Sequence, residues 1–207
     1  MNTNNLINDL IEPKDEYDGL SAIGIYLWIL NAVDTSSNLA ENRLLMDRVG
    51  KFFAMQMRGP AFVCESLRIV EKIKKNGLSF NNDEEALNFV RNGLRKFRNF
   101  EETSFASKVL HLADNKHEFI IYDSLVKKAL KDLLDLPKEP KSYYEVKSAF
   151  LTFKESIFTP SILIQEKDTK KCHDFISEFG STLKQKELAI SLNKTIDFYL
   201  WGKEKFK

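Results

Sequence analysis

Glycine and proline are scarce in this chain, and their scarcity is the first constraint on its fold. The 207 residues include only 8 glycines and 5 prolines. All-β and loop-rich folds need many turns, which these two residues form most readily. The composition therefore argues against both classes and favours helices. The 43% hydrophobic content is enough for one compact unit, or for two small helical lobes around a cleft.

Cysteine is scarce as well, and neither positive nor negative residues are in clear excess. Cys64 and Cys172 are too far apart for a zinc motif or a disulfide framework, so we expect free thiols and no metal or other cofactor. Lys and Arg number 31 against 30 Asp and Glu, which gives a formal charge of +1. Dedicated polyanion binders usually carry a larger basic excess. Nucleic-acid binding would therefore depend on a local basic patch.

The chain also lacks a hydrophobic run long enough for a membrane span. Its longest apolar stretch, AIGIYLWILNAV at 22–33, is interrupted by Asn31 and falls short of the roughly 20 residues that a bilayer requires. The first residues are acids and amides where a signal peptide would have basic residues and an apolar run. We expect a cytoplasmic protein without a membrane partner.

Apolar residues recur at spacings of three and four along most of the chain, which predicts α-helices. We expect them over 20–33, 39–57, 60–76, 82–97, 105–113, 124–136, 143–158, 171–179 and 184–201. Pro60 suits a first helical turn, Asn76-Gly77 a left-handed helix end, and Asn82 with Glu85 a capping box. FIIY, at 119–122, has the composition of a short extended segment.

The expected fold is therefore all-α, with many helices in one compact unit over 1–207. Pro137 and Pro140 mark the best internal boundary. We expect two lobes around a cleft, formed by 1–100 plus 138–207 and by a core at 101–137.

A helix, a turn, an extended stretch and an aspartate follow one another at 105–130, in FASKVLHLADNKHEFIIYDSLVKKAL. This order resembles the core of the helix-hairpin-helix DNA glycosylase superfamily, in which a catalytic aspartate opens a helix after an extended stretch. Asp123 falls on that aspartate, and Ile120, Ile121 and Tyr122 fall on the extended stretch. The family helix is matched by Ala106, Val109, Leu110 and Ala113. The resemblance covers about 30 of the 207 residues.

The resemblance implies an enzyme that cleaves the N-glycosidic bond of a modified or damaged base in double-stranded DNA, after the base has flipped out of the stack. Asp123 would stabilise the positive charge that develops on the sugar, and would orient or activate water. Lys108 is the nearest candidate for the lysine that lyase-active members place after the hairpin, although it lies about one helical turn late. Tyr122 and Ser124 would line the base pocket. The candidate DNA contacts are Arg91, Arg95, Lys96, Arg98, Ser104, Ser107 and Lys127.

The hairpin departs from the family pattern. Residues 98–107 read RNFEETSFAS, without the glycines that let the family backbone approach a DNA phosphate closely. Glu101 and Glu102 would repel a phosphate there. With no lysine at the family position, a monofunctional glycosylase is the more consistent version.

The same residues also have structural interpretations. Asp123 can be the N-cap of its helix, His111 a buried hydrogen-bonded imidazole, and the basic face of 91–98 a solvated surface. Two other functions stay open. One is a non-catalytic regulatory protein on the same scaffold that binds nucleic acid or protein, with Asp123 satisfied as a cap. The other is an unrelated helical interaction module whose apolar surface forms an oligomer.

Overall fold

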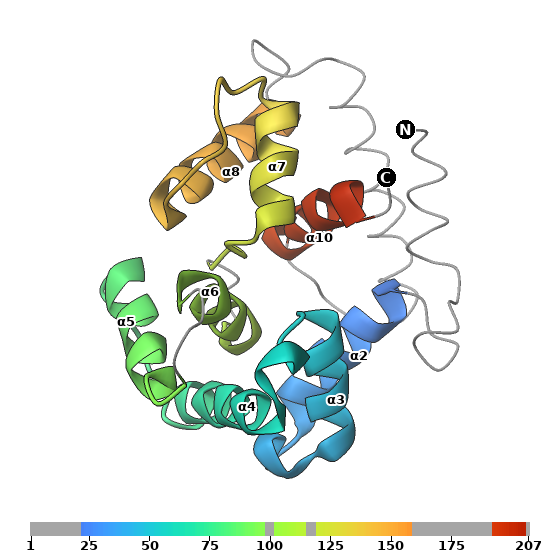
Figure 1. Cartoon of the computed structure of the whole chain (residues 1–207), viewed down its shortest axis with the longest axis vertical. Helices are drawn as coiled ribbons and strands as arrows, with labels where there is room; N and C mark the ends of the chain where they lie inside the picture. Colours follow the sequence, from blue (N-terminus) through green and yellow to red (C-terminus); the bar gives the residue numbers. More distant parts are fainter. Residues whose placement is uncertain (1–21, 98–101, 115–118, 159–191, 206–207) are drawn as a thin grey trace. The chain divides into compact units, whose positions relative to one another are not determined.

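The computed structural model of the protein describes residues 22–97, 102–114, 119–158 and 192–205 (Figure 1). Over these residues the chain is all-helical, as predicted, with eight α-helices and no β-strand. The chain divides into two compact units between Phe119 and Ile120. This boundary lies within 101–137, the segment expected to form one core. The cleft between the expected lobes stays a prediction.

The described part of the N-terminal unit contains five α-helices and two short 3₁₀ turns. They are α2 (Ala22–Thr35), η2 (Leu39–Glu41), α3 (Arg43–Phe52), η3 (Gln56–Arg58), α4 (Pro60–Lys75), α5 (Asp83–Leu94) and α6 (Glu102–Ala113). Helix α4 is central, because it packs against α3, α5, α6 and both 3₁₀ turns. Phe62 on α4 is fully buried, and the rings of Phe97 and Phe105 meet it edge-on at 5.3 and 5.0 Å. Aromatic rings therefore supply much of the core of this unit.

The single helix predicted over 39–57 is wrong, because the chain turns twice within that range. The side chain of Asn42 accepts a hydrogen bond from the backbone N–H of Leu45 at 3.0 Å and so begins α3 as a new helix. Ala54 then adopts a left-handed φ of 54°, which ends α3 before η3 begins. The apolar periodicity continues through both interruptions, so it does not reveal them.

The other helix-end signals of this unit are confirmed. Pro60 is the first residue of α4, and Gly77, with φ of 56°, follows the end of that helix. Asn82 caps α5 by accepting from the N–H of Glu85 at 2.9 Å. The return bond of the capping box differs from the prediction, since the Glu85 carboxylate accepts from the N–H of Asn81, at 2.9 Å.

The described part of the C-terminal unit contains α7 (Ser124–Leu133), α8 (Tyr143–Phe158) and α10 (Leu192–Lys205). Helix α7 packs against both α8 and α10. It ends three residues earlier than predicted, and Asp135 takes a left-handed φ of 48° just beyond it. The helix predicted over 171–179 lies outside the described residues. Seven consecutive α10 residues, Lys194 to Leu200, are buried, so this helix is enclosed on all sides over that stretch.

Candidate functional site around Asp123

Asp123 lies at the junction between a non-helical segment and α7. Residues 119–123 are not helical, and Asp123 itself is extended, with φ of −132° and ψ of 152°. Its Oδ1 accepts the backbone N–H of Leu125 at 2.8 Å, so the side chain caps α7. The side chain is half-buried. A carboxylate here also interacts favourably with the positive end of the helix dipole.

The segment that precedes Asp123 is anchored by one helix, α10, and by the loop that precedes α8. Ile120, Ile121 and Tyr122 are all buried. The backbone N–H of Ile121 donates to Oδ2 of Asp197 on α10 at 3.3 Å. The hydroxyl of Tyr122 donates to the backbone carbonyl of Lys141, which precedes α8. These contacts fix the position from which Asp123 projects.

Asp197 is a second carboxyl group of this region, and no motif in the sequence points to it. Burial raises its pKa well above the usual range, and the negative charge of Asp123 raises it further. The hydrogen bond from Ile121 and the charge of Lys194 act in the opposite direction. The two carboxyls therefore differ, since Asp197 is fully buried and Asp123 is partly accessible. Asp197 sits beside the apolar stripe of α10, where a helical pattern predicts a solvated residue.

Three other predicted site residues surround Asp123 in the C-terminal unit. The Lys127 Nζ lies 4.5 Å from the centre of the Tyr122 ring, a cation–π contact between neighbouring residues of one site. Ser124 is exposed at the first position of α7. The Tyr122 ring is buried and packs within the unit. The structure thus brings Asp123, Ser124 and Lys127 to one accessible end of α7.

The predicted residues on α6 belong to the N-terminal unit, and all three are buried. The Lys108 Nζ donates to the backbone carbonyl of Phe53 at 3.2 Å. The Ser107 hydroxyl donates to the carbonyl of Ser104 at 2.8 Å. Burial of these groups follows from the position of α6, which packs against α2, α4 and α5. Their hydrogen bonds satisfy polar groups inside the unit, as buried polar groups require. Their roles toward DNA stay predictions.

His111, also on α6, has both ring nitrogens within hydrogen-bond distance of a partner. Its Nδ1 faces the Phe119 carbonyl at 3.2 Å and its Nε2 faces the Tyr26 hydroxyl at 2.8 Å. A carbonyl only accepts, so Nδ1 carries a proton, and in the neutral imidazole the tyrosine hydroxyl then donates to Nε2. The structural interpretation of His111 as a buried hydrogen-bonded imidazole is confirmed.

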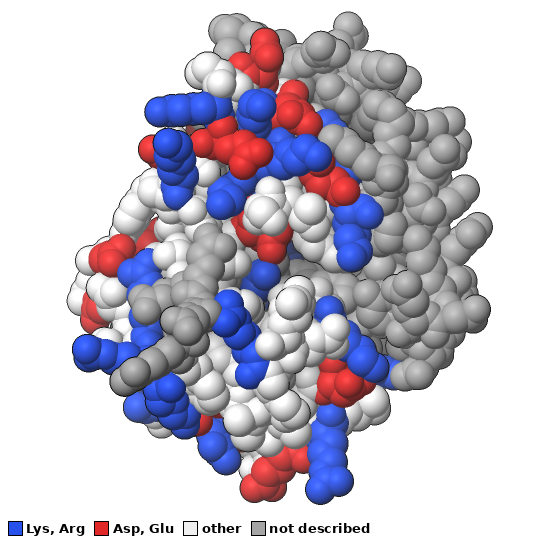
Figure 2. Space-filling model, viewed as in Figure 1, with Lys and Arg blue, Asp and Glu red and all other residues white. Residues whose placement is uncertain are grey.

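The predicted basic face of α5 is partly engaged in ion pairs. Arg91 contacts Glu84 at 3.0 Å and Thr103 at 2.8 Å, and Lys96 contacts Glu65 at 2.8 Å. Arg95 is exposed, whereas Arg98 lies outside the described residues. Figure 2 shows basic side chains gathered over the part of the surface where α4 and α5 lie.

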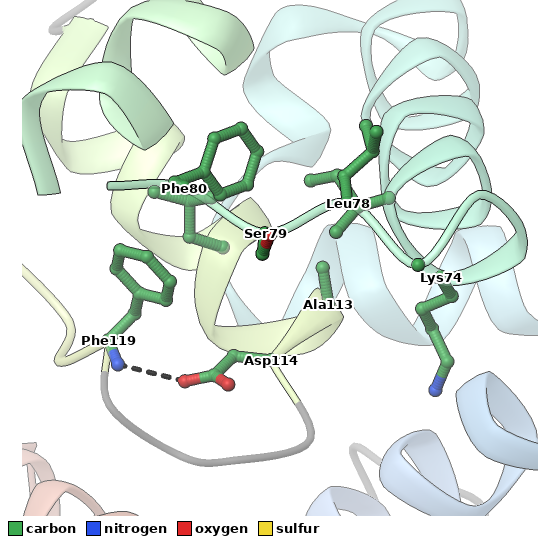
Figure 3. Close-up of a pocket in the computed structure, with 10 residues that line it drawn as sticks. Lys74, Leu78, Ser79, Phe80, Ala113, Asp114 and Phe119 are labelled. Atoms are coloured by element: carbon green, nitrogen blue, oxygen red, sulfur yellow. Dashed lines mark hydrogen bonds between the residues drawn. The ribbon is translucent and has the colours of Figure 1, made fainter. Parts of the chain in front are cut away.

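A hollow of about 310 Å³ lies at the ends of α4 and α6, within the N-terminal unit (Figure 3). Phe80 and Phe119 lie on one side of it, and Leu78 and the stem of Lys74 lie on the other. Asp114 lines it as well, and its Oδ2 accepts the N–H of Phe119 at 2.9 Å. None of the site residues predicted from the sequence lines this hollow.

No protein-family model, curated protein or solved structure matches this chain. In the described ranges, no helix is both long and apolar enough to cross a membrane. The same residues contain no group of three or more His, Cys, Asp or Glu side chains placed to hold a metal ion. The function must therefore be argued from the surroundings of Asp123 and from the surface chemistry of each unit.

Proposed function

We propose that this protein is a divergent DNA glycosylase-like enzyme that cleaves the N-glycosidic bond of a modified or damaged base in double-stranded DNA. The observation that carries the proposal is the placement of Asp123. A buried, anchored segment delivers this carboxylate to the N-terminus of α7, where it is partly accessible. That order of helix α6, non-helical segment, aspartate and helix α7 is the one expected from the family resemblance.

The chemistry needs a carboxylate held close to the sugar. Departure of the base leaves positive charge on the sugar, as in glycoside hydrolysis. An ionised Asp123 would stabilise this charge and orient the attacking water, and the dipole of α7 favours its ionised form. The anchoring of 119–122 lowers the reorganisation that the carboxylate needs during reaction.

Water, and not an amine, is the nucleophile in this proposal. The lysine closest to the family position, Lys108, is buried and donates to the Phe53 carbonyl. An amine bonded in this way is not presented to a substrate. The proposal is therefore a monofunctional glycosylase, with Arg95 and Lys96 among its contacts to DNA phosphate.

A second function is favoured by one specific contact. Because Oδ1 of Asp123 accepts the N–H of Leu125, a helix cap alone accounts for an aspartate at this position. The second candidate is a non-catalytic helical protein on the same scaffold that binds nucleic acid. The two candidates differ in what they require of Asp123, since a cap needs an acceptor oxygen and catalysis needs the negative charge.

The substitution Asp123→Asn separates these requirements. Asparagine retains the acceptor, and Asn42 and Asn82 already cap helices in this chain. Full-length protein would be incubated with duplexes that each carry one deaminated, oxidised or alkylated base, and base release would be read as strand breakage after hot alkali. We expect release from at least one duplex, and a loss of about 10²-fold or more in rate for Asp123→Asn.

Two results would contradict the proposal, the first for the role of Asp123 and the second for the enzyme as a whole. Equal rates for wild type and Asp123→Asn would make Asp123 a cap only. Absence of base release from every duplex by wild type would remove the catalytic function, and retained DNA binding would then favour the second candidate.

A further inference from the structure

Helices α4 and α5 run antiparallel along one surface of the N-terminal unit, and three pairs of residues join α4 to α5 and to the turn that follows it. The Lys72 Nζ lies 5.3 Å from the centre of the Phe89 ring. Further along, Gly93 lies against Ile69, and a Cβ added to this glycine would lie 2.7 Å from the Ile69 Cδ1. Beyond these, Lys96 pairs with Glu65 at 2.8 Å. The helices therefore approach closely along this seam.

A shallow groove of about 310 Å³ follows the seam. Its lining consists of Glu65, Arg68, Ile69, Lys72, Phe89, Asn92 and Gly93. It thus combines one phenyl ring with long basic side chains, and Asn92 adds an amide that can both donate and accept. The Phe89 ring is half-buried and packs against Phe80, with 5.5 Å between the ring centres and the two rings tilted.

The charge of the groove is basic. The side chains of Arg68 and Lys96 are 61% and 60% exposed, so both extend into solvent, and Lys72 is exposed as well. Glu65 is the carboxylate of the lining, and it pairs with both Arg68, at 3.4 Å, and Lys96. The hydrogen bond from Lys96 lowers the pKa of Glu65, so this carboxylate offsets one positive charge among several.

We propose that this groove, lined by Arg68, Lys72, Phe89 and Asn92 and flanked by Lys96, which pairs with Glu65 of the lining, binds a single-stranded segment of nucleic acid. The three cations bind successive phosphates, and an unpaired base stacks on Phe89. Basic grooves with aromatic platforms bind single strands in this way, because every base has a face that can stack on a ring. A paired base cannot enter the groove, since its faces are covered by its neighbours in the duplex.

Lys72 links the two parts of this binding mode. In the free protein its ammonium group lies over the Phe89 ring. Its long, exposed side chain can exchange the ring for a phosphate, which uncovers the ring face for a base. The inference rests on the nucleic-acid partner of the proposed function, but not on its chemistry, and Asp123 has no part in it.

Fluorescence anisotropy of a labelled oligo-dT strand across a salt series tests the groove, with full-length protein. We expect the double variant Arg68→Ala/Lys72→Ala to bind at least tenfold more weakly. Its salt dependence should fall as well, because each lost phosphate contact lowers the slope of log K against log salt by about 0.7. Phe89→Leu keeps an apolar side chain but removes the ring, so it should weaken binding by about fivefold to a hundredfold with the slope unchanged.

Lys51→Ala is the matched control, because Lys51 is an exposed, ion-paired helical lysine of the same unit outside the groove. It should leave both affinity and slope near the wild-type values. Circular dichroism melting of each variant checks folding, and the charge reversal Lys72→Glu gives a second variant that keeps a long side chain.

Four outcomes would contradict nucleic-acid binding in the groove. Wild type would not bind oligo-dT at about 50 mM salt, or the groove variants would bind it with wild-type affinity. Lys51→Ala would lose as much affinity as the groove variants, or polyglutamate would bind as tightly as oligo-dT with no effect of Phe89→Leu. The last result would indicate an acidic peptide instead. Asp123→Asn distinguishes this inference from the proposed enzyme, since it should slow base release by about 10²-fold or more and leave oligo-dT binding intact. If the groove variants bind with wild-type affinity, binding in the groove is contradicted and the proposed enzyme is unaffected.

Discussion

At the scale of single residues, Asp123 combines a hydrogen-bond acceptor with a negative charge, and the two have separate energetic consequences. The acceptor satisfies the N–H of Leu125, which otherwise has no partner within the first turn of α7. Only the charge serves the proposed chemistry. Stability measurements on variants of Asp123 therefore report on the cap, independently of any substrate.

We expect Asp123→Ala to lower the free energy of unfolding by about 1 kcal/mol, because the N-cap bond is lost. Asp123→Asn should change it by only a few tenths, since asparagine is an equally good cap. Urea unfolding followed by circular dichroism measures both. Asn82→Ala, which removes the cap of α5, should cost a similar amount and serves as the reference. Equal losses for the Ala and Asn variants at 123 would show that the charge, and not the cap, stabilises α7.

At the scale of elements, the glycines of the N-terminal unit show how packing can oppose helix propensity. Gly93 lies near the end of α5 and Gly50 lies in α3, and neither has a positive φ. A Cβ at Gly50 would meet Val63 at 3.4 Å, an ordinary contact, whereas one at Gly93 would be 2.7 Å from the Ile69 Cδ1. Ile69 is buried, so its side chain has little room to yield.

The two alanine substitutions should therefore have opposite signs. Gly50→Ala should stabilise the protein by up to about 1 kcal/mol through helix propensity. Gly93→Ala should destabilise it by about 1 kcal/mol, because the crowding against Ile69 exceeds the gain in propensity. In an Ile69→Val background, which lacks the Cδ1, the cost of Gly93→Ala should fall by about 0.5 kcal/mol or more. Urea unfolding of the four proteins of this cycle gives the coupling, and a cost that is independent of Ile69 would contradict the close approach.

Several element ends were predictable because a local residue decides them. Pro60, Gly77 and the Asn82 cap act within one turn of chain, so the sequence reveals them directly. The break before α3 also has a local signal, the Asn42 cap, but the continuous apolar periodicity hides it. The break after α3 was not predictable, since the left-handed Ala54 is not a residue type that signals a turn. Its conformation depends on packing within the unit, which apolar periodicity does not encode.

At the scale of the whole molecule, the contacts that define both candidate sites join residues far apart in the sequence. Asp123 was singled out from a local pattern, but Asp197 reaches the same segment from 76 positions away through its bond to Ile121. In the groove, Lys96 was predicted as part of the basic face, whereas its partner Glu65 lies 31 positions away on another helix. A sequence read in windows of one helix cannot predict such pairs.

The buried carboxyl of Asp197 should also give the protein a pH-dependent stability of unusual sign. Burial raises the pKa of this group, so its contribution to stability is fully present below the unfolded pKa of about 3.9 and is lost as pH rises through the folded pKa. Glu65 behaves oppositely, because its lowered pKa makes its contribution disappear as pH falls. Glu65 is present in both wild type and Asp197→Asn. Its effect therefore cancels when the free energies of unfolding of the two proteins are subtracted.

Asp197→Asn keeps an acceptor for the N–H of Ile121 and removes the group that must ionise inside the unit. We expect this variant to match wild type near pH 4 and to become progressively more stable than wild type as pH rises from about 4 toward 8. Urea unfolding at several pH values in this range measures the difference. Parallel pH profiles would mean that Asp197 keeps an ordinary pKa in the folded protein. A variant that is less stable at every pH would mean that its carboxylate is held by a strong favourable charge, and burial would no longer dominate at this position.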